Sequence, residues 1–317
     1  MQKVTIVIPN YNGRRLLENC LKTLENQTYT DFKVLIIDNG STDGSKEIIS
    51  DTLDMEMVSL ETNLGFCGAV NLGIQMTNTP YIILLNNDTE TDRYFVETLL
   101  KAIERSEKIF SCGAQMIDFQ NHKILDNAGD LYTAMGWAVA RGKGKRCIDY
   151  EKKKRVFSCC AGAAIYRMDI LNQIGGLDEH HFAYLEDLDI GYRARIFGYQ
   201  NWYAPKAKVY HVGSGTSGSR YNQFKIRYSS RNNIYLIYKN MPFFQIVLNL
   251  PFLLVGFGAK ILFFASKGFG REYLAGIKNG FQISRKNRKV KFSMRNFPRY
   301  IQLQVELWIN IFRRFAG

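Results

Sequence analysis

Acidic residues are almost absent from the last third of this chain. From Arg220 onward the sequence has 18 lysines and arginines but only two acids, Glu272 and Glu306. Residues 1–219 carry 24 basic and 27 acidic residues, so the net charge of +13 arises entirely in the C-terminal part. This asymmetry predicts two regions, a near-neutral one over 1–240 and a basic, apolar-rich one over 241–317.

The six cysteines lack the paired spacing of zinc sites. No typical signal peptide opens the sequence either, because Met1-Gln2-Lys3 leads directly into an apolar, strand-like run. We therefore expect free thiols in a reducing compartment, the cytoplasm. The adjacent pair Cys159-Cys160 is interpreted as packing rather than redox chemistry.

A glycine-rich phosphate loop is also missing after the first predicted strand, Val4–Ile8. That strand ends in Pro9-Asn10-Tyr11-Asn12-Gly13, which is neither a G-x-G-x-x-G fingerprint nor a basic, Gly-rich loop. The sequence therefore argues against a nicotinamide-dependent enzyme and against a nucleotidyltransferase.

Apolar runs and helical spacings alternate along the first half of the chain. Strand-like runs end in polar turns, and each is followed by a segment with helical periodicity. Predicted strands are 4–8, 32–37, 55–60, 81–85 and 112–117; predicted helices are 14–26, 45–53, 63–76, 94–109 and 168–174. This order predicts an α/β fold with a doubly wound, mostly parallel sheet. The run 152–155, Lys-Lys-Lys-Arg, favours a solvated, mobile excursion over a specific anion site.

The strand at 81–85 organises the predicted site. It is apolar throughout and ends in Asn86-Asn87-Asp88. Ligands of open α/β sheets bind beyond the carboxyl ends of such strands, and a carboxylate there suits a divalent cation holding a diphosphate. On these residues alone, a buried strand running into a polar turn is an equal alternative.

Four motifs in order resemble family 2 glycosyltransferases of the GT-A fold, and in particular bacterial rhamnosyltransferase-like members. The resemblance covers roughly residues 3–240. Its motifs are Val4-Thr5-Ile6-Val7-Ile8-Pro9-Asn10-Tyr11-Asn12, Ile36-Ile37-Asp38-Asn39-Gly40-Ser41-Thr42-Asp43-Gly44, Asn63-Leu64-Gly65-Phe66 and Leu84-Leu85-Asn86-Asn87-Asp88.

The resemblance implies a nucleotide-sugar site at the strand ends. Asp38 would accept a hydrogen bond from a pyrimidine ring, with Pro9, Tyr11 and Asn12 lining the base. Asp88 would be the last residue of a D-x-D-type motif, whose first carboxylate is replaced here by Asn86. Asn86 and Asn87 would then hydrogen-bond the ribose or the sugar.

A second ligand for a Mn²⁺ or Mg²⁺ ion is implied at His211, which ends the run Val209-Tyr210-His211. Taken alone, a histidine at a strand end is more often structural. The glycine-rich loop 213–218 would close over the diphosphate, with Arg220 as a donor. Three further cations follow: Lys225, Arg227 and Arg231. They could bind the diphosphate, an anionic acceptor or only water, and Arg231 is the preferred candidate among them for binding an anion.

Three carboxylates are crowded at Glu186, Asp187 and Asp189. Crowding raises the pKa of at least one of them, which suits a general base, although an acidic first helical turn paired with arginines is the plain alternative. The resemblance implies that Asp187 is the base and that Glu186 binds the acceptor or orients the base. Asp189 is expected to cap the helix or to pair with an arginine.

The basic C-terminal region has an amphipathic pattern. Residues 241–265 are apolar but are interrupted by Pro251 and Lys260, which favours a helix lying in the membrane interface over a spanning one. The run 285–291 is rich in cations that attract anionic lipid. Ile301, Val305, Trp308, Phe312 and Phe315 form an apolar stripe. Packing on the catalytic domain, or in a homodimer, is the alternative to membrane contact.

Together these features predict an inverting, metal-dependent glycosyltransferase, peripheral on the inner face of the cell membrane. The donor would be dTDP-rhamnose or a UDP-hexose, and the acceptor a hydroxyl of a lipid-linked or polymeric cell-surface glycan. The alternative is a nucleic-acid-binding protein that uses the basic tail. Long apolar runs separate the cations of that tail, which suits lipid and argues against a nucleic-acid partner.

Overall fold

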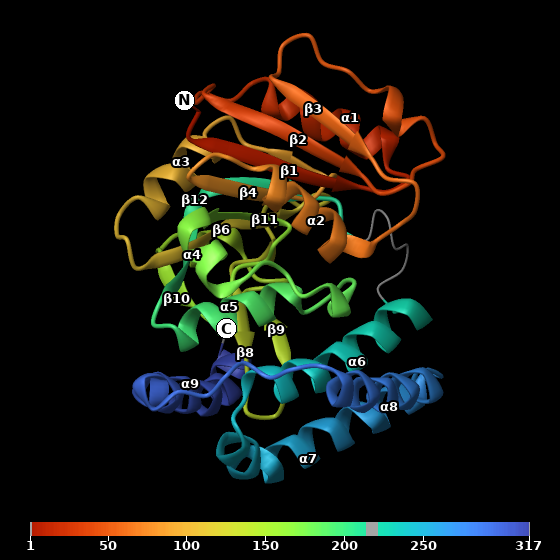
Figure 1. Ribbon diagram of the computed structural model, residues 1–317, viewed down its shortest axis with the longest axis vertical. Coiled ribbons are helices and arrows are strands. Elements are labelled where there is room, and N and C mark those ends of the chain that lie inside the picture. The colour runs from red at the N-terminus through yellow and green to blue at the C-terminus, as the bar shows by residue number, and fades with distance from the viewer. Residues whose placement is uncertain (1, 214–220, 317) are drawn as a thin grey trace.

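The computed structural model describes residues 2–213 and 221–316 as a mixed α/β domain above a layer of helices (Figure 1). A ten-stranded sheet and a separate two-stranded ribbon, β8–β9, form its β structure. The strands are β1 Val4–Asn10, β2 Phe32–Asp38, β3 Met55–Ser59, β4 Tyr81–Leu85, β5 Thr89–Thr91, β6 Ile109–Asp118, β7 Leu125–Asn127, β8 Asp130–Tyr132, β9 Ala138–Ala140, β10 Lys154–Val156, β11 Ala163–Arg167 and β12 Gln200–His211.

The strand order of the sheet is β10-β12-β6-β11-β4-β1-β2-β3, with β5 and β7 attached to β12 and β6. The half formed by β4, β1, β2 and β3 is parallel, so the carboxyl ends of these strands meet at one edge. Strand β11 runs antiparallel between β4 and β6, which makes the whole sheet mixed. The α/β class expected from the sequence is confirmed.

Helices cover both faces of the sheet, because the strands are apolar on both sides. Ile6 and Ile8 of β1 pack with α1 and α3, whereas Val7 packs with α2, α4 and α5. The helices are α1 Arg14–Leu24, α2 Gly65–Met76, α3 Phe95–Ile103, α4 Met168–Ile174, α5 Glu186–Ile196, α6 Gln223–Asn240, α7 Phe243–Ser266, α8 Gly270–Lys286 and α9 Phe297–Ala316.

Three predicted segments differ in the structure. The helix expected at 45–53 is only a 3₁₀ turn, Ser45–Glu47, because the backbone turns extended at Ile48, which packs into the core while Ile49 faces solvent. The helix expected at 94–109 ends at Ile103, and Ile109 already begins β6. The basic run at 152–155 is exposed, as expected, but its last two residues start the edge strand β10 and are therefore not a mobile excursion.

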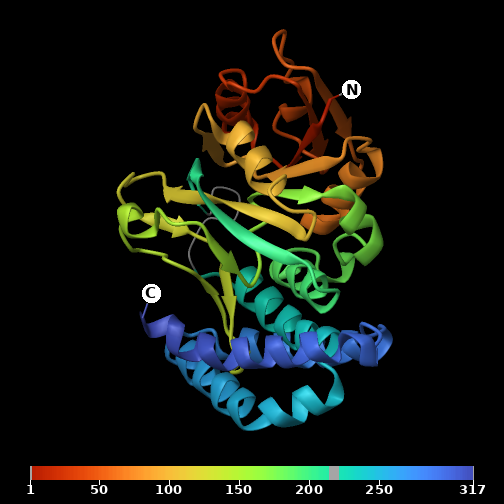
Figure 2. The ribbon, with the colours of Figure 1, turned by 90° about the vertical axis from the view of Figure 1, so that its left-hand side faces the viewer.

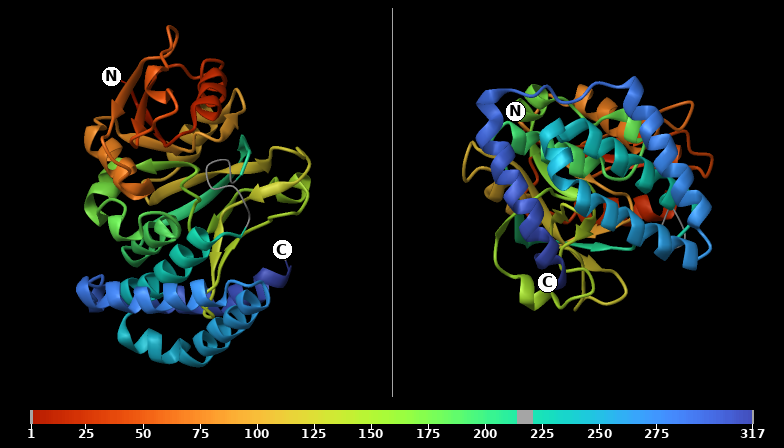
Figure 3. Two further views of the ribbon diagram at one scale, coloured as in Figure 1. Left: turned by 90° about the vertical axis from the view of Figure 1, so that its right-hand side faces the viewer. Right: turned by 90° about the horizontal axis from the view of Figure 1, so that it is seen from below.

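Helices α6 to α9 form a layer under the sheet domain (Figure 3). Helix α8 lies close against α6: a Cβ added at Gly276 would come within 1.8 Å of Ser230 Oγ. The β8–β9 ribbon descends onto this layer, and the Met135 carbonyl in its turn would meet a Cβ at Gly256 of α7 at 2.1 Å (Figure 2). A third core, with Tyr132, Tyr192 and Leu307 among its fully buried side chains, joins the ribbon, α5 and the helical layer.

Candidate active site

Buried amides and a carboxylate connect the ends of β1, β2 and β4. The Asn10 amide donates to Asp38 Oδ1 at 2.9 Å, and Asn87 donates to Asn10 Oδ1 at 2.7 Å. The other oxygen of Asp38 accepts the Ser41 backbone N–H at 3.0 Å. Parallel pairing of β1 with β2 places Asn10 opposite Asp38, which is fully buried. The structure thus brings together three polar residues that the sequence placed at separate strand ends.

The turn after β1, residues 11–13, forms part of the protein surface beside Asp38. Tyr11 and Asn12 are exposed, and Pro9 is half-buried. Asn12 has a left-handed φ of 48°. It is held there because its backbone N–H donates to Ser41 Oγ at 2.8 Å and its side-chain oxygen accepts the Thr42 N–H at 2.8 Å. An open aromatic ring next to fixed backbone suits a planar base, as the sequence predicts, and base binding here stays a prediction.

Asp88 and His211 lie together, at the ends of β4 and β12. His211 Nε2 is 3.4 Å from Asp88 Oδ1, and His211 Nδ1 is 2.8 Å from Asp126 Oδ2. Strand pairing brings these residues together, because β5, directly after Asp88, pairs antiparallel with the end of β12. Burial lowers the pKa of His211, but hydrogen bonding to Asp126 and Asp88 outweighs it and raises the pKa to about 9. The imidazolium thus bridges two carboxylates.

Asp88 and His211 fit a divalent cation as a pair of ligands. Asp88 Oδ1 is buried, and its one close polar neighbour among the described residues is His211 Nε2, which lies 3.4 Å away, at the long end of hydrogen bonding. Asp126 holds the other ring nitrogen, which is the usual outer-sphere support of a metal-binding histidine. A cation would displace the Nε2 proton. Among residues 2–213 and 221–316 there is no cluster of three or more metal-ligating side chains, so the described part of the chain offers Asp88 and His211 as a pair.

Glu186 and Asp187 stand at the N-terminus of α5. Glu186 is buried, with Oε2 unpartnered, and Asp187 is half-buried. Burial and the charge of Asp187 raise the pKa of Glu186 to about 8. Burial raises the pKa of Asp187 less, to about 6, because backbone N–H groups of Leu188 and Ala161 oppose the shift. The two carboxyl groups titrate as a linked pair, and burial together with their mutual repulsion lets the pair keep a proton to a higher pH than separate carboxyls would.

Residues 160–162 connect these acids with the end of β4. The Asn86 N–H donates to the Gly162 carbonyl at 2.9 Å. The next residue back, Ala161, presents its amide to Asp187. A Cβ at Gly162 would come within 3.0 Å of the Asn86 side chain, so this small-residue segment lies directly against the D-x-D-type position. The predicted sugar-binding and proton-accepting residues thus border one site.

The loop that precedes the acids has a strained backbone. Phe182, Tyr184 and Leu185 have positive φ values of 61°, 73° and 66°. Such a conformation costs energy unless the surroundings hold it. Asn232 of α6 does so, since its amide donates to the carbonyls of His181, Ala183 and Tyr184 at 2.7–2.9 Å.

Arg231 has a comparable supporting role. Its Nη2 donates to the carbonyls of His180 and His181 at 2.7 and 2.8 Å, and its guanidinium stacks on Tyr228. The structure therefore shows Arg231 holding the loop before the acids, and contact with a diphosphate stays a prediction. Arg220, the other predicted cation, lies outside the described residues.

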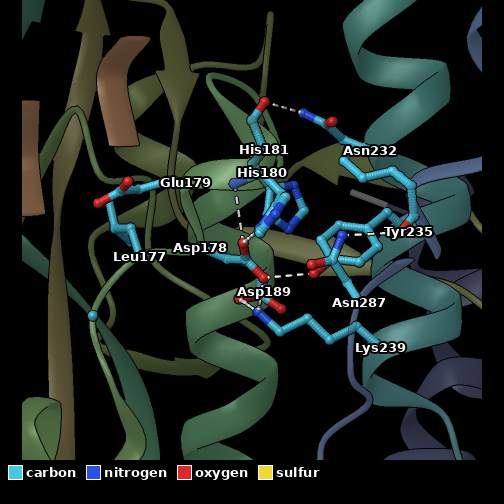
Figure 4. A network of polar contacts seen from close by, with 12 residues as sticks. Leu177, Asp178, Glu179, His180, His181, Asp189, Asn232, Tyr235, Lys239 and Asn287 are labelled. Carbon is cyan, nitrogen blue, oxygen red and sulfur yellow. Dashed lines mark hydrogen bonds and ion pairs between the residues drawn. The ribbon is translucent and has the colours of Figure 1, made fainter. Parts of the chain in front are cut away.

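A buried ionic network anchors the same loop from below (Figure 4). Lys239 Nζ lies 2.6 Å from Asp178 Oδ2 and 2.9 Å from Asp189 Oδ2. Asp189 also accepts from Arg193 Nε at 2.9 Å, so the predicted arginine pairing of this residue is what the structure shows. Asp178 accepts the Tyr235 hydroxyl hydrogen at 2.8 Å. Asp189 therefore has a structural role, which leaves Glu186 and Asp187 as the candidate catalytic carboxylates.

Sequence reasoning missed Asp126 and Asp130. Asp126 orients His211. Burial and the nearby charge of Asp187 raise the pKa of Asp130. Both lie in the stretch 121–155, whose strands are too short to produce a clear periodic pattern in the sequence. An isolated aspartate in such a stretch carries no signal until the fold places it.

The family 2 glycosyl transferase model matches residues 5–175, more than half of the chain. The chain belongs to glycosyl transferase family 2. Two curated relatives align over most of it: an N-acetylglucosaminyl-diphospho-decaprenol L-rhamnosyltransferase of Mycobacterium tuberculosis, 25% identical over 67% of this chain and 77% of the relative, and the O-antigen chain rhamnosyltransferase RfbN of Salmonella typhimurium, 25% identical over 70% of each.

Other relatives match only in part. A teichoic acid poly(glycerol phosphate) polymerase of Staphylococcus epidermidis is 27% identical over 35% of this chain. The aligned part covers only 16% of that longer protein. Likewise, the chain spans 15% of the glycosyltransferase GlyA of Streptococcus pneumoniae.

Solved structures of glycosyltransferases share the fold. GalNAc-T7 with UDP, GalNAc and Mn²⁺ superposes with a TM-score of 0.60 at 15% identity, over 75% of this chain and 48% of that one. S. aureus TarS 1-349 with UDP-GlcNAc gives 0.56 at 17% identity, over 99% and 85%. The predicted GT-A fold is confirmed.

Proposed function

We propose that this glycosyltransferase is inverting and transfers a sugar from a nucleoside-diphosphate donor, dTDP-rhamnose or a UDP-hexose, to a hydroxyl of a lipid-linked or polymeric cell-surface glycan. One observation carries the proposal: Asp187, half-buried beside Glu186 and with a raised pKa, borders the same segment, 160–162, as the strand end that bears Asn86. The rhamnosyltransferase relatives support the donor choice.

In the proposed reaction Asp187 accepts the proton of the acceptor hydroxyl. The acceptor oxygen forms a bond to the anomeric carbon, and the bond from that carbon to the diphosphate oxygen breaks, with its electron pair leaving on the nucleoside diphosphate. Glu186, protonated, donates a hydrogen bond that orients the acceptor or Asp187. A pKa near 6 keeps Asp187 ionised at neutral pH while leaving it basic enough to act.

Asp88 and His211 would hold a Mn²⁺ or Mg²⁺ ion, with Asp126 fixing the imidazole. When bound, the ion would stabilise the charge that grows on the departing diphosphate. GalNAc-T7, whose fold is similar, was solved with Mn²⁺, which supports a divalent ion here. Asn10 and Asp38 would bind the nucleotide part of the donor, next to the exposed Tyr11 ring, and so orient the sugar.

We also propose that the enzyme is peripheral on the inner face of the cell membrane. Helix α7 is the one described helix that is long and apolar enough to cross a bilayer, with a mean hydropathy of 2.0. Its polar residues face inward: Gln245 accepts from Tyr192, and Asn249 and Gln304 exchange amide hydrogen bonds. Most of its apolar residues are exposed, and α7 lies on the side of the helical layer that is farthest from the sheet (Figure 1).

This inside-out pattern supports lipid contact. Phe243 of α7 is 77% exposed and Leu262 is 74% exposed; on α9, Phe312 is 73% exposed. On α9, Tyr300 and Leu307 pack inward and Trp308 of the predicted stripe packs partly against the same core, whereas the other stripe residues are exposed: Ile301, Val305, Phe312 and Phe315. The cationic run 285–291 ends α8 and continues toward α9, and its charge complements anionic head groups. A second copy of the chain is the competing occupant, to be detected as a dimer.

Substitution of the base tests the catalytic proposal. Asp187→Asn should abolish transfer while the variant keeps wild-type thermal stabilisation by UDP or dTDP with Mn²⁺. Glu186→Gln is the matched neighbour and should retain measurable turnover, because an amide still donates a hydrogen bond. Wild-type turnover in Asp187→Asn would show that another group is the base.

Vesicle sedimentation tests the membrane proposal. The double variant Leu254→Glu/Val255→Glu should lose binding to phosphatidylglycerol vesicles, whereas Ile49→Glu, at an equally exposed site on the sheet domain, should not. Equal binding of all three proteins, or a dimer that the double variant dissociates, would contradict lipid contact by α7.

A further inference from the structure

A large basic pocket lies between the β8–β9 ribbon and the ends of α7 and α9, outside the residues assigned above. Its volume is about 780 Å³. Five basic side chains and no acidic side chain line it: Arg141, Lys143, Lys260, Arg313 and Arg314. Such a concentration of positive charge within apolar walls raises the local concentration of anions.

Besides Arg141, which donates to the Ala128 carbonyl, three of these cations have no carboxylate partner among the described residues. Arg314 stacks on the Trp137 ring, 3.8 Å from its centroid, and its Nη1 is buried without a hydrogen-bond partner. Arg313 donates only to the Asn310 side-chain oxygen, at 3.3 Å. Lys260 lies 6.0 Å from the Trp137 centroid and forms no ion pair. By contrast, Lys143 is paired with Asp126.

Lys260 is the most unusual of the three because it sits on the otherwise apolar helix α7. Burial and the nearby Arg314 charge lower its pKa to about 8. A partly buried ammonium without a counter-charge is unfavourable unless an anion accompanies it. The pocket is therefore built for a ligand that carries negative charge.

The pocket reaches in two directions. Inward, its wall includes Leu131, the chain neighbour of Asp130, and Lys143, whose partner Asp126 holds His211. Outward, it is bordered by Phe263, which continues the exposed apolar face of α7. An occupant with a charged middle and an apolar end would thus lie between Lys143, the partner of Asp126, and the exposed apolar face of α7.

We propose that this pocket binds the diphosphate of a lipid-linked acceptor, with Lys260, Arg313 and Arg314 on the phosphate oxygens and the lipid chain on α7. The inference rests on the proposed function and makes it more specific, because it selects a lipid diphosphate over a polymeric acceptor. Trp137 lies under the phosphate position, held by its indole N–H bond to the Gly256 carbonyl at 2.9 Å.

Calorimetric titration of the full-length protein with farnesyl diphosphate tests the pocket, with farnesol and phosphatidylglycerol vesicles as comparisons. Farnesyl diphosphate should bind and change the Trp137 fluorescence, and farnesol should not. Lys260→Gln and Arg314→Gln should each weaken binding by about 10-fold, the value of one charged hydrogen bond. Lys278→Gln, an exposed cation on α8 outside the pocket, should leave affinity unchanged.

Affinities of Lys260→Gln and Arg314→Gln within twofold of wild type would overturn the proposal. So would displacement of farnesyl diphosphate by phosphatidylglycerol vesicles at equal phosphate, which would make the pocket a phospholipid head-group site. The same preparations are tested for stabilisation by UDP and dTDP. Nucleotide stabilisation without prenyl diphosphate binding refutes the pocket alone, and the reverse result refutes the proposed transferase.

Discussion

Replacement of Lys239 by methionine tests how the catalytic loop is anchored. The ammonium of Lys239 lies between Asp178 and Asp189, 2.6 and 2.9 Å from their carboxylates, and all three groups are largely buried. Methionine keeps much of the volume of the side chain but removes the charge. Asp178 would retain Tyr235, and Asp189 would retain Arg193, so neither carboxylate becomes fully unpaired.

Removal of one partner from a buried ion pair lowers the free energy of unfolding by about 3–5 kcal/mol. Because both aspartates keep another partner, we expect Lys239→Met to lie at the lower end, about 3 kcal/mol. At roughly 2 °C per kcal/mol for a chain of this size, the melting temperature should fall by about 6 °C. The pKa values of Asp178 and Asp189 lie well below the usual range, because Lys239 and other donors outweigh burial. Their stabilisation is present above their unfolded pKa, near about 4, and is lost as pH falls below it.

Thermal denaturation at several pH values provides the measurement. The difference between wild type and Lys239→Met should be full at pH 6 to 8 and should shrink below about pH 4. Lys101→Met is the control, since Lys101 makes an exposed pair with Glu97 and should change the melting temperature little. A Lys239→Met protein that melts within about 1 °C of wild type at pH 7 would refute the structural role of this network.

Three further predictions concern the site and its support. Because the pKa of Asp187 is about 6, kcat/KM should fall tenfold per pH unit below that value, and a flat profile down to pH 5 would remove it as the base. Asp126→Asn replaces the charged acceptor of His211 Nδ1 by a neutral amide oxygen, so half-activation should require about 10–100 times more Mn²⁺, with kcat largely restored at saturation; unchanged metal demand would contradict metal binding by His211. Gly256→Ala should destabilise the protein by about 1–3 kcal/mol because its Cβ meets a backbone carbonyl, whereas Gly258→Ala, which meets no atom within 4 Å, should not.

Much of the sheet domain could be predicted from local pattern. The buried runs at 4–8, 32–37 and 81–85 are strands, since each is apolar on both faces and ends in polar turn residues. The antiparallel insertion of β11 could not be predicted, because apolar alternation does not encode which neighbour a strand selects or in which direction it runs. The helix expected at 45–53 did not form beyond one turn, since the chain becomes extended at Ile48 to bury that side chain in the core.

The sequence by itself determined the family and the residues at the strand ends, among them Asp38 and Asp88, because those signals are contiguous motifs. Only the tertiary structure decided that Asp126 supports His211, 85 positions away, and that Arg231 holds the loop before the acids. It also decided that α7 turns its amides inward and its apolar side chains outward, since composition fixes the content of a helix but packing fixes its orientation. Contacts between distant segments arise from the folded chain, and no local pattern contains them.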